Sequence, residues 1–369
     1  MEYILLQEKI IEKQTLGGIV IVSLIENISR NIYPLEKKYM QQAQARLDRL
    51  IKPTGSLGKM ENICAQLAGI YGKKYFDTSK KIIISFAGDH GVYEEGVAPD
   101  PQNITILQFQ NFPKRINGVG TISKFVGADV LAVDVGIKKK KKIEGVLDYK
   151  IRKGTSNMAK GPAMTRKEAE KCISIGIEMA EKCIQDDYTV IGIGEMGIAN
   201  TTPSTAIISV FADCDPKEIT GMGAGLKKEL IMHKADVIRK SIELNKPNPK
   251  DAIDVLSKVG GFEIGAMAGV IIGCAANRIP VVLDGFISYA AALLAYHINP
   301  KTKEYMIASH LSAEPGAKKA LDMMGLKAFL DMDMRLGEGS GAALAFNIIE
   351  ASNYVYKNMA TFDEIDMGR

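Results

Sequence analysis

Two glutamates stand in glycine-rich loops, and they are the residues of this sequence best placed to do chemistry. Glu195 lies within residues 192–197, and Glu338 lies between Gly337 and Gly339. Glycine lets the backbone come close to a ligand, so a carboxylate on such a loop can reach a bound molecule. A carboxylate can remove a proton or stabilise developing positive charge. We therefore predict chemistry at both loops, with a local hydrogen-bonding strut as the alternative for Glu195.

The loop around Glu195 also predicts a phosphate site. Residues 189–191 have the apolar character of a buried strand, glycines follow at 192, 194 and 197, and a helix opens at Thr201. The first N–H groups of a helix have no intrahelical partner and bind anions. Thr201 and Thr202 suit helix caps, and Pro203 suits an early helical position. A phosphate is the expected ligand at this helix start.

A second glycine-rich loop, residues 220–225, precedes an amphipathic helix over 226–244. That helix carries Lys234, whose ammonium group is a candidate phosphate ligand. The alternative is a solvated surface lysine, because long charged side chains on a helix normally keep their charge in water.

Four short apolar runs of strand type indicate the sheet that must position these loops. They cover residues 81–86, 130–133, 189–193 and 280–283, with helical stretches between most of them. Buried strands that alternate with helices imply a parallel α/β sheet. Each run is followed by, or ends near, an acid close to a glycine: Asp89, Asp134, Glu195 and Asp284. Ligands bind outside the carboxyl ends of parallel strands, so we expect one crevice surrounded by these acids, although each alone also suits a turn.

Helical patterns account for much of the remaining chain. Residues 35–71 predict two helices separated by a turn at 52–58. Small residues recur over 265–276, which suits a helix packed closely on the sheet or across a subunit interface. A long final helix is expected from Ala342.

Composition narrows the class of protein. The chain has 369 residues, 46% of them hydrophobic, and can bury a large core. A formal net charge of only +4, with scattered lysines, argues against nucleic-acid binding. Five cysteines without a C-x-x-C pair favour a reducing cytoplasm, and four separated histidines give no metal-ligand spacing.

The apolar run at residues 17–25 is the nearest approach to a secretory signal. Glu2, Glu8 and Glu12 interrupt its basic region and no small-residue cleavage site follows, so a cytosolic segment is predicted instead. No apolar run reaches the length of a membrane span, so no membrane association is expected.

A dinucleotide-binding fold is the alternative that the glycine spacing raises. Gly192, Gly194 and Gly197 match G-x-G-x-x-G, and Asp213 lies at a suitable distance. A pyrophosphate held by this loop would be repelled by Glu195. Asp213 also follows the helix directly, and no strand completes a βαβ unit after it. An NAD-dependent oxidoreductase is therefore the weaker interpretation.

Several stretches together resemble the nicotinate-nucleotide–dimethylbenzimidazole phosphoribosyltransferases of cobamide assembly. They are ARLDRL at 45–50, KPTGSLG at 52–58, AGDHGV at 87–92, PQ at 101–102, GEMGIANTT at 194–202, TG at 220–221, DG at 284–285, SHLSAE at 309–314 and RLGEG at 335–339. The resemblance extends from about residue 35 to residue 362. So many matches in one order are far more specific than any single glycine loop.

The resemblance implies an activity and an architecture. Members transfer the phosphoribosyl group of nicotinate mononucleotide to a lower-ligand base, giving an α-ribazole phosphate and nicotinate, with no metal or other cofactor. They have a Rossmann-like parallel sheet flanked by helices and a small helical domain formed from both chain ends. For this chain we expect an N-terminal extension over 1–30, a small domain over 31–75 plus about 340–369, and a catalytic domain over 76–339. A dimer is implied, either of two copies or with a paralogue.

The resemblance also implies residue roles. Glu338 is expected to be the general base on the N–H group of the incoming base, and Glu195 a second active-site carboxylate. The residues implied for phosphate and nucleotide binding are Gly197, Thr201, Gly223, Lys234, Gly285 and Ser312. The residues implied near the incoming base are Asp89, Gln102, Leu336 and Gly337.

One departure from the family pattern bears on the base site. Residues 111–118 (NFPKRING) replace a glycine- and alanine-rich helix start. The acceptor therefore stays open among benzimidazole, adenine and phenol. A non-catalytic partner subunit of the same fold is a further alternative, which the presence of both Glu195 and Glu338 opposes.

Overall fold

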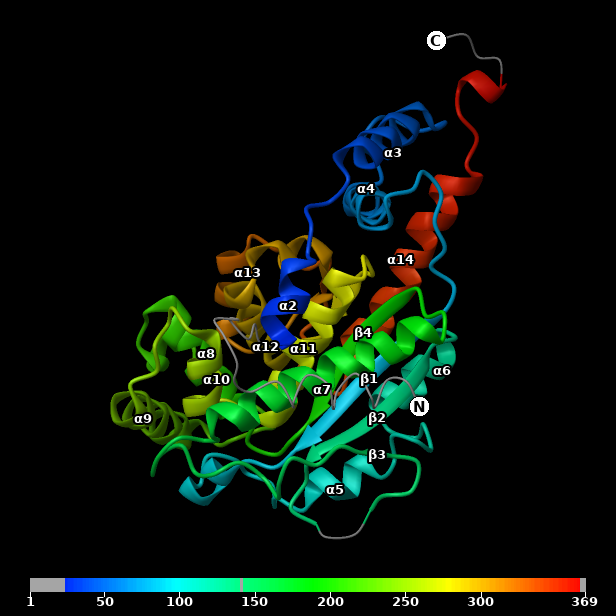
Figure 1. Ribbon diagram of the computed structural model, residues 1–369. Helices are drawn as coiled ribbons and strands as arrows, with labels where there is room; N and C mark the ends of the chain where they lie inside the picture. The colour runs from blue at the N-terminus through cyan, green and yellow to red at the C-terminus, as the bar shows by residue number, and fades with distance from the viewer. Residues whose placement is uncertain (1–23, 140–141, 366–369) are drawn as a thin grey trace, which may run out of the picture.

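The computed structural model describes residues 24–139 and 142–365. Its main strands are β1 (Lys81–Gly88), β2 (Asp129–Gly136), β3 (Leu147–Asp148), β4 (Val190–Met196), β5 (Val281–Leu283) and β6 (Met306–Ala308). They form one sheet in the order β3-β2-β1-β4-β5-β6, and every adjacent pair is parallel. Figure 1 labels the first four strands of this order. The predicted α/β fold with a parallel sheet is confirmed. The strands β3 and β6 were not predicted, because two or three residues carry no readable periodicity.

The strand order reverses between β1 and β4. From β1 the chain adds β2 and β3 on one side, then returns to add β4, β5 and β6 on the other. Phe86 of β1 pairs with Glu195 of β4, and Asp89 follows β1 directly. Ligand sites of open parallel sheets lie at such a reversal, outside the carboxyl ends of the strands. Two of the predicted acids therefore lie at the point where the topology favours a site.

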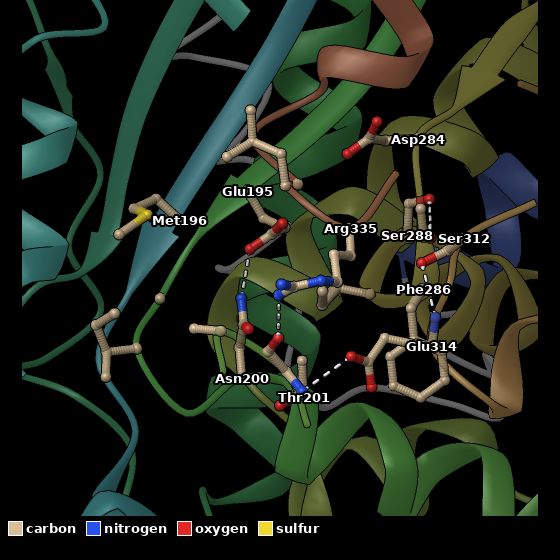
Figure 2. Close-up of a pocket in the computed structure, with 18 of the residues that line it drawn as sticks. Glu195, Met196, Asn200, Thr201, Asp284, Phe286, Ser288, Ser312, Glu314 and Arg335 are labelled. Atoms are coloured by element: carbon tan, nitrogen blue, oxygen red, sulfur yellow. Dashed lines mark hydrogen bonds between the residues drawn. The ribbon is translucent and has the colours of Figure 1, made fainter. Parts of the chain in front are cut away.

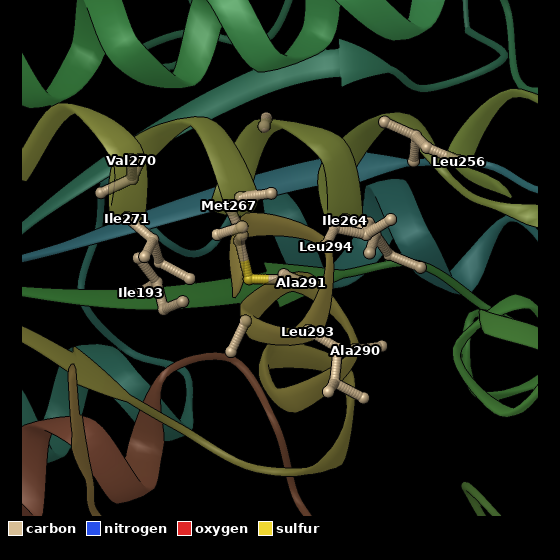
Figure 3. Close-up of a cluster of buried hydrophobic side chains, with 14 of the residues drawn as sticks. Ile193, Leu256, Ile264, Met267, Val270, Ile271, Ala290, Ala291, Leu293 and Leu294 are labelled. Carbon is tan, nitrogen blue, oxygen red and sulfur yellow. The ribbon is translucent and has the colours of Figure 1, made fainter. Parts of the chain in front are cut away.

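Helices cover both faces of the sheet. They are α2 (Leu24–Arg30), α3 (Lys37–Arg49), α4 (Lys59–Tyr71), α5 (Ile104–Phe109), α6 (Gly118–Phe125), α7 (Arg166–Gln185), α8 (Thr201–Ala212), α9 (Lys228–Asn245), α10 (Ala252–Val259), α11 (Phe262–Ala276), α12 (Phe286–Ile298), α13 (Gly316–Met324) and α14 (Ser340–Asn358). Successive strand residues point to opposite faces. Ile82 and Ile84 join the core under α7 and α11, whereas Ile83 joins the core under α6 and α14. Figure 3 shows Ile193 of β4 beside Met267 and Ile271 of α11.

The small residues of α11 serve close packing within the chain. This helix lies on the sheet and runs against α7. A Cβ at Gly176 of α7 would lie 1.8 Å from the carbonyl oxygen of Ala266, and one at Gly269 would lie 2.0 Å from that of Ile173. Backbone-to-backbone contact of this kind requires glycine. The glycines of residues 265–276 therefore contact α7, which was not one of the two predicted settings, while α11 as a whole packs on the sheet.

Gly176→Ala is expected to destabilise the fold by about 1–3 kcal/mol, the usual cost of overpacking a tight core. The reason is that its methyl group would force α7 and α11 apart. Gly161→Ala is the matched control, because a Cβ there meets nothing within 4 Å. Urea unfolding at equilibrium measures both variants. Equal midpoints for the two would contradict the close approach.

Helices α3 and α4 pack against α14, which is distant from them in the sequence. Arg46 Nε of α3 donates to the carbonyl of Tyr356 at 2.8 Å, and Cys64 Sγ of α4 donates to that of Ser352 at 3.0 Å. The opposite end of α14 lies on the sheet, where Phe346 packs over Gly192. The interrupted helix predicted at 35–71 is confirmed as α3 and α4. The domain boundaries at 75/76 and 339/340 stay a prediction.

The predicted N-terminal extension is described only from residue 24. Within it, α2 packs on α7 and α11 and buries Ile25. Asn299 Nδ2 donates to the carbonyl oxygen of Ser29 at 2.9 Å. The expectation for residues 17–25 lies largely outside the described residues.

Candidate active site

A pocket opens at the carboxyl ends of β4 and β5 (Figure 2). It contains about 710 Å³ of space between its lining atoms, including the part open to solvent. Eight of the twelve predicted site residues line it: Glu195, Gly197, Thr201, Gly223, Gly285, Ser312, Leu336 and Gly337. The other four, Glu338, Lys234, Asp89 and Gln102, are not among the residues that line it.

The loop that carries Glu338 lies directly on the sheet. The carbonyl of Glu338 accepts a hydrogen bond of 2.9 Å from Ser85 Oγ of β1. On β4, a Cβ at Gly194 would lie 2.1 Å from that same carbonyl oxygen. Glu338 has a φ of 66°, a left-handed conformation that is uncommon outside glycine and is concentrated at functional sites. The strands thus fix the backbone that presents this carboxylate.

Asp284 anchors the other end of the same loop. Its Oδ2 accepts from Gly339 N at 3.1 Å, and its Oδ1 accepts from Gly341 N at 2.7 Å. These N–H groups belong to the start of α14, where backbone donors have no helical partner. Burial raises the pKa of Asp284 to about 7, against the effect of these bonds. Asp284 was predicted as one of the acids around the crevice and does line the pocket, but no catalytic or binding role was predicted for it.

The carboxylate of Glu338 is held by the start of α6. Its Oε2 accepts from Asn117 Nδ2 and from Val119 N, both at 2.9 Å. Burial raises the pKa of Glu338, the two hydrogen bonds lower it, and the charge of Asp284 raises it. The end of the predicted departure at residues 111–118 therefore contacts the predicted general base. Asn117 was missed, since nothing local connects it to Glu338.

Glu195 lies inside strand β4, so the prediction that it stands in a loop is wrong. The strand continues because Glu195 and Met196 pair with Phe86 and Ala87 of β1. Asn200 Nδ2 donates to the Oε2 of Glu195 (Figure 2). Burial raises the pKa of Glu195 to about 8, and the charges of Asp284 and Glu263 add to this effect.

The predicted cap at the start of α8 is also wrong in detail. Asn200 occupies the N-cap position, and neither Thr201 nor Thr202 does. The Asn200 side chain does not cap α8, because it donates its hydrogen bond to Glu195. Thr201 instead accepts a hydrogen bond from Lys234, and Pro203 lies in the first turn as predicted.

Lys234 is buried behind the pocket wall with only 1% of its surface exposed, so the interpretation as a solvated lysine is wrong. Its Nζ donates to Thr201 Oγ1 at 2.7 Å and to the Gly221 carbonyl at 3.4 Å. Burial lowers the pKa of Lys234 to about 8, and the charge of Glu314 opposes this. A partly compensated cation beside a helix start is suited to an anionic ligand.

Glu314 occupies part of the predicted phosphate-binding site. Its Oε1 accepts from Gly223 N at 2.9 Å, so that backbone donor is already in use. Arg335 reaches the same loop and donates to the Gly223 carbonyl at 3.3 Å (Figure 2). Neither residue was predicted, although both stand in the motifs SHLSAE and RLGEG. A phosphate that used the Gly223 N–H group would have to replace Glu314 there.

The two remaining predicted residues lie beyond β1. Asp89 Oδ2 accepts from Lys138 N at 2.8 Å, and burial raises the pKa of Asp89. Gln102 Nε2 donates to the His90 carbonyl at 2.8 Å. Their place near the incoming base stays a prediction.

Glu195→Gln is expected to remove a pH-dependent loss of stability. The folded-state pKa of about 8 lies above the ordinary 4.5, so the folded protein resists ionising this group. The resulting penalty is absent below about pH 4.5 and grows as pH rises to about 8. Thermal midpoints of parent and variant at pH 5 and pH 9 test this. The thermal midpoint of the variant should be higher, relative to that of the parent, at pH 9 than at pH 5. The same difference in midpoint at both pH values would contradict the raised pKa of Glu195.

Metal and membrane sites have no support in the described residues. Across residues 24–139 and 142–365, no group of three or more His, Cys, Asp or Glu is arranged to hold a metal ion. In the same part of the chain, no helix is both long and apolar enough to cross a bilayer.

Comparison with known proteins gives consistent matches over most of the chain. A family described as Phosphoribosyltransferase matches residues 32–366. The nicotinate-nucleotide–dimethylbenzimidazole phosphoribosyltransferase of Clostridioides difficile (strain 630) is 75% identical, covering 94% of this chain and 100% of that protein. The protein of the same name from Alkaliphilus metalliredigens (strain QYMF) is 52% identical, covering 91% and 96%. The crystal structure of CobT from Thermus thermophilus superposes with a TM-score of 0.86 at 34% identity, covering 90% and 99%.

Proposed function

The chain belongs to the nicotinate-nucleotide–dimethylbenzimidazole phosphoribosyltransferase family, and from this premise we propose how its pocket works. The enzyme transfers the 5-phosphoribosyl group of nicotinate mononucleotide to a lower-ligand base. The products are an α-ribazole 5′-phosphate and nicotinate. The observation that supports this most is that Glu195 lines the pocket, while Glu338 follows the lining residue Gly337 and Lys234 donates to the lining residue Thr201.

The reaction exchanges one carbon–nitrogen bond for another at the anomeric carbon. The bond to the pyridinium breaks, and nicotinate leaves with the electron pair as a neutral ring nitrogen. A ring nitrogen of the acceptor forms the new bond from the opposite face. The acceptor's other nitrogen loses its proton, which Glu338 accepts. Because the leaving group is already activated, positioning supplies a large share of the catalysis.

The two carboxylates have different tasks in this proposal. Glu338 keeps hydrogen-bond donors on its carboxylate, which favour the charged form that a base requires. Glu195 has the pKa of about 8 and is mostly protonated in the free pocket at neutral pH. A bound pyridinium would lower that pKa, since an opposite charge favours the ionised form. Glu195 then stabilises positive charge on the ring and ribose.

The phosphate is proposed to bind between α8 and the loop before α9. Lys234 and Thr201 supply side-chain donors there, and the residues Gly197, Gly223, Gly285 and Ser312 line the same wall. Asp89, Gln102, Leu336 and Gly337 are proposed for the acceptor side. Leu336 is largely exposed in the free protein and can fold over a flat ring.

The alternatives have less support. An oxidoreductase of the dinucleotide type needs a strand after α8, whereas Asp213 is the C-cap of that helix and α9 follows. A non-catalytic subunit would not need two buried carboxylates in the pocket. All five cysteines are free thiols, which supports the cytoplasmic location that we propose. We also propose a dimer, of two copies or with a paralogue, which light scattering of the purified chain tests.

Turnover with nicotinate mononucleotide and a panel of acceptors tests the function. Dimethylbenzimidazole, adenine and a phenol would compete in one tube, with the products resolved by mass. We expect a benzimidazole product, and the panel ranks the other two. Absence of nicotinate release with every acceptor would overturn the proposal.

A further inference from the structure

Asn117, the N-cap residue of α6, contacts Glu338. We propose that Asn117 is a positioning residue, which fixes one oxygen of Glu338 so that the other meets the proton of the incoming base. This inference rests on the proposed role of Glu338 as the general base.

The amide of Asn117 has only one orientation that satisfies both of its neighbours. Its Oδ1 accepts from Gly120 N at 3.2 Å, which caps the N-terminus of α6. Its Nδ2 donates to Glu338 Oε2 at 2.9 Å. A flipped amide would turn its nitrogen toward the Gly120 N–H group and its oxygen toward the carboxylate. The helix cap therefore determines that a donor, and not an acceptor, faces Glu338.

The contact is tight and lies out of solvent. Val119 N donates to the same oxygen, Oε2, at 2.9 Å. A Cβ at Gly118 would lie 2.5 Å from Leu336 Cδ2 and 2.9 Å from Glu338 Oε2, so the first turn of α6 presses on the Glu338 loop. Asn117 is 9% exposed and Glu338 is 7% exposed. The hydrogen bond between them is therefore largely shielded from solvent.

The two hydrogen bonds to Oε2 make the two carboxylate oxygens of Glu338 different in their ability to accept a proton. An oxygen that already accepts two hydrogen bonds is the weaker proton acceptor, which leaves Oε1 for the substrate. Both bonds also favour the ionised form against burial. The titratable groups that face Glu338 are Asp284, whose charge opposes ionisation, and Glu195, which lies against the Glu338 backbone. Asn117 contributes a donor with no charge of its own.

Asn117→Asp separates positioning from helix capping. Aspartate is as good an N-cap as asparagine, so α6 should stay folded. Its second oxygen would replace the donor and place a like charge beside Glu338, which raises the pKa of that group. We expect kcat to fall roughly 100-fold at neutral pH and the acid limb of its pH profile to move up by about one unit or more. KM for nicotinate mononucleotide should stay unchanged.

Asn117→Ala should lower stability more than Asn117→Asp does, but lower activity less. It removes both the cap and the donor, so thermal stability falls further than in Asn117→Asp. Activity, however, should fall only roughly 10-fold, as for one lost hydrogen bond to a charged group. If activity follows stability instead, with Asn117→Ala the slower enzyme, Asn117 is a helix cap only and the inference is overturned.

Asn299→Asp is the matched control. Asn299 also caps a helix through its oxygen, accepting from Lys301 N at 3.0 Å, and its Nδ2 donates to the neutral Ser29 carbonyl away from the pocket. This variant should keep the parent pH profile. Glu338→Gln is measured in parallel. If Glu338→Gln is inactive while Asn117→Asp behaves as the parent, the positioning role of Asn117 is overturned and the general-base role of Glu338 stands. If Glu338→Gln is active, both roles are overturned.

Discussion

Glu338→Gln is expected to lower kcat by roughly 10²–10⁴-fold, the usual contribution of a general base. Glutamine keeps the shape of the side chain, and its oxygen can still accept from Asn117 and Val119. It cannot take the proton that the acceptor must lose as it attacks. Steady-state turnover with dimethylbenzimidazole measures the effect.

Substrate binding provides the control for this variant. Nicotinate mononucleotide should bind Glu338→Gln with the affinity of the parent, because its phosphate is proposed to lie near Lys234. Calorimetric titration without acceptor tests this. Glu195→Gln should cost less turnover if Glu195 only stabilises charge. Near-normal turnover in Glu338→Gln would transfer the base role to Glu195 or to Asp89.

Lys234→Met is expected to weaken nicotinate mononucleotide binding by about 1.5–3 kcal/mol, roughly 10- to 100-fold in Kd. Methionine fills nearly the same volume, so the change removes the charge without the cavity that alanine would leave at this buried position. The affinity for dimethylbenzimidazole should move little. Calorimetric titration of each ligand measures both effects.

The difference in nucleotide affinity between Lys234→Met and the parent should depend on pH, because the charge of Lys234 does. Burial lowers the pKa of Lys234 to about 8, so the free enzyme loses the ammonium charge as pH rises above 8. A phosphate favours the charged form, and binding must then restore the proton. The ratio of Kd values between Lys234→Met and the parent should therefore shrink above about pH 8.

Lys81→Met is the control for removing a buried lysine elsewhere. Lys81 is nearly as buried and pairs with Glu350 at 2.6 Å, far along β1 from the pocket. Its loss should leave nucleotide affinity unchanged. If Lys234→Met also binds as the parent does, Lys234 only ties Thr201 to the Gly221 loop and holds no phosphate.

Local patterns in the sequence determined the sheet and the two glycine-rich segments that carry Glu195 and Glu338. The apolar runs at 81–86, 130–133, 189–193 and 280–283 correspond to β1, β2, β4 and β5. Such runs are readable because each is continuous and bounded by glycine and acid. The parallel order then placed their carboxyl ends together. Glu195 and Glu338 could be singled out for the same reason, since their glycine neighbours lie beside them in the chain.

The tertiary structure alone decided which groups surround these carboxylates. Asn117 lies 221 positions from Glu338, and Gly223 lies 91 positions from Glu314. Burial of Lys234 depends on the packing of α9 against α8, which its own helix pattern does not reveal. The sequence therefore identified which residues could react. Their pKa values, their hydrogen-bond partners and the oxygen left for the substrate arise from contacts between distant segments, because hydration and nearby charges change only when the chain folds.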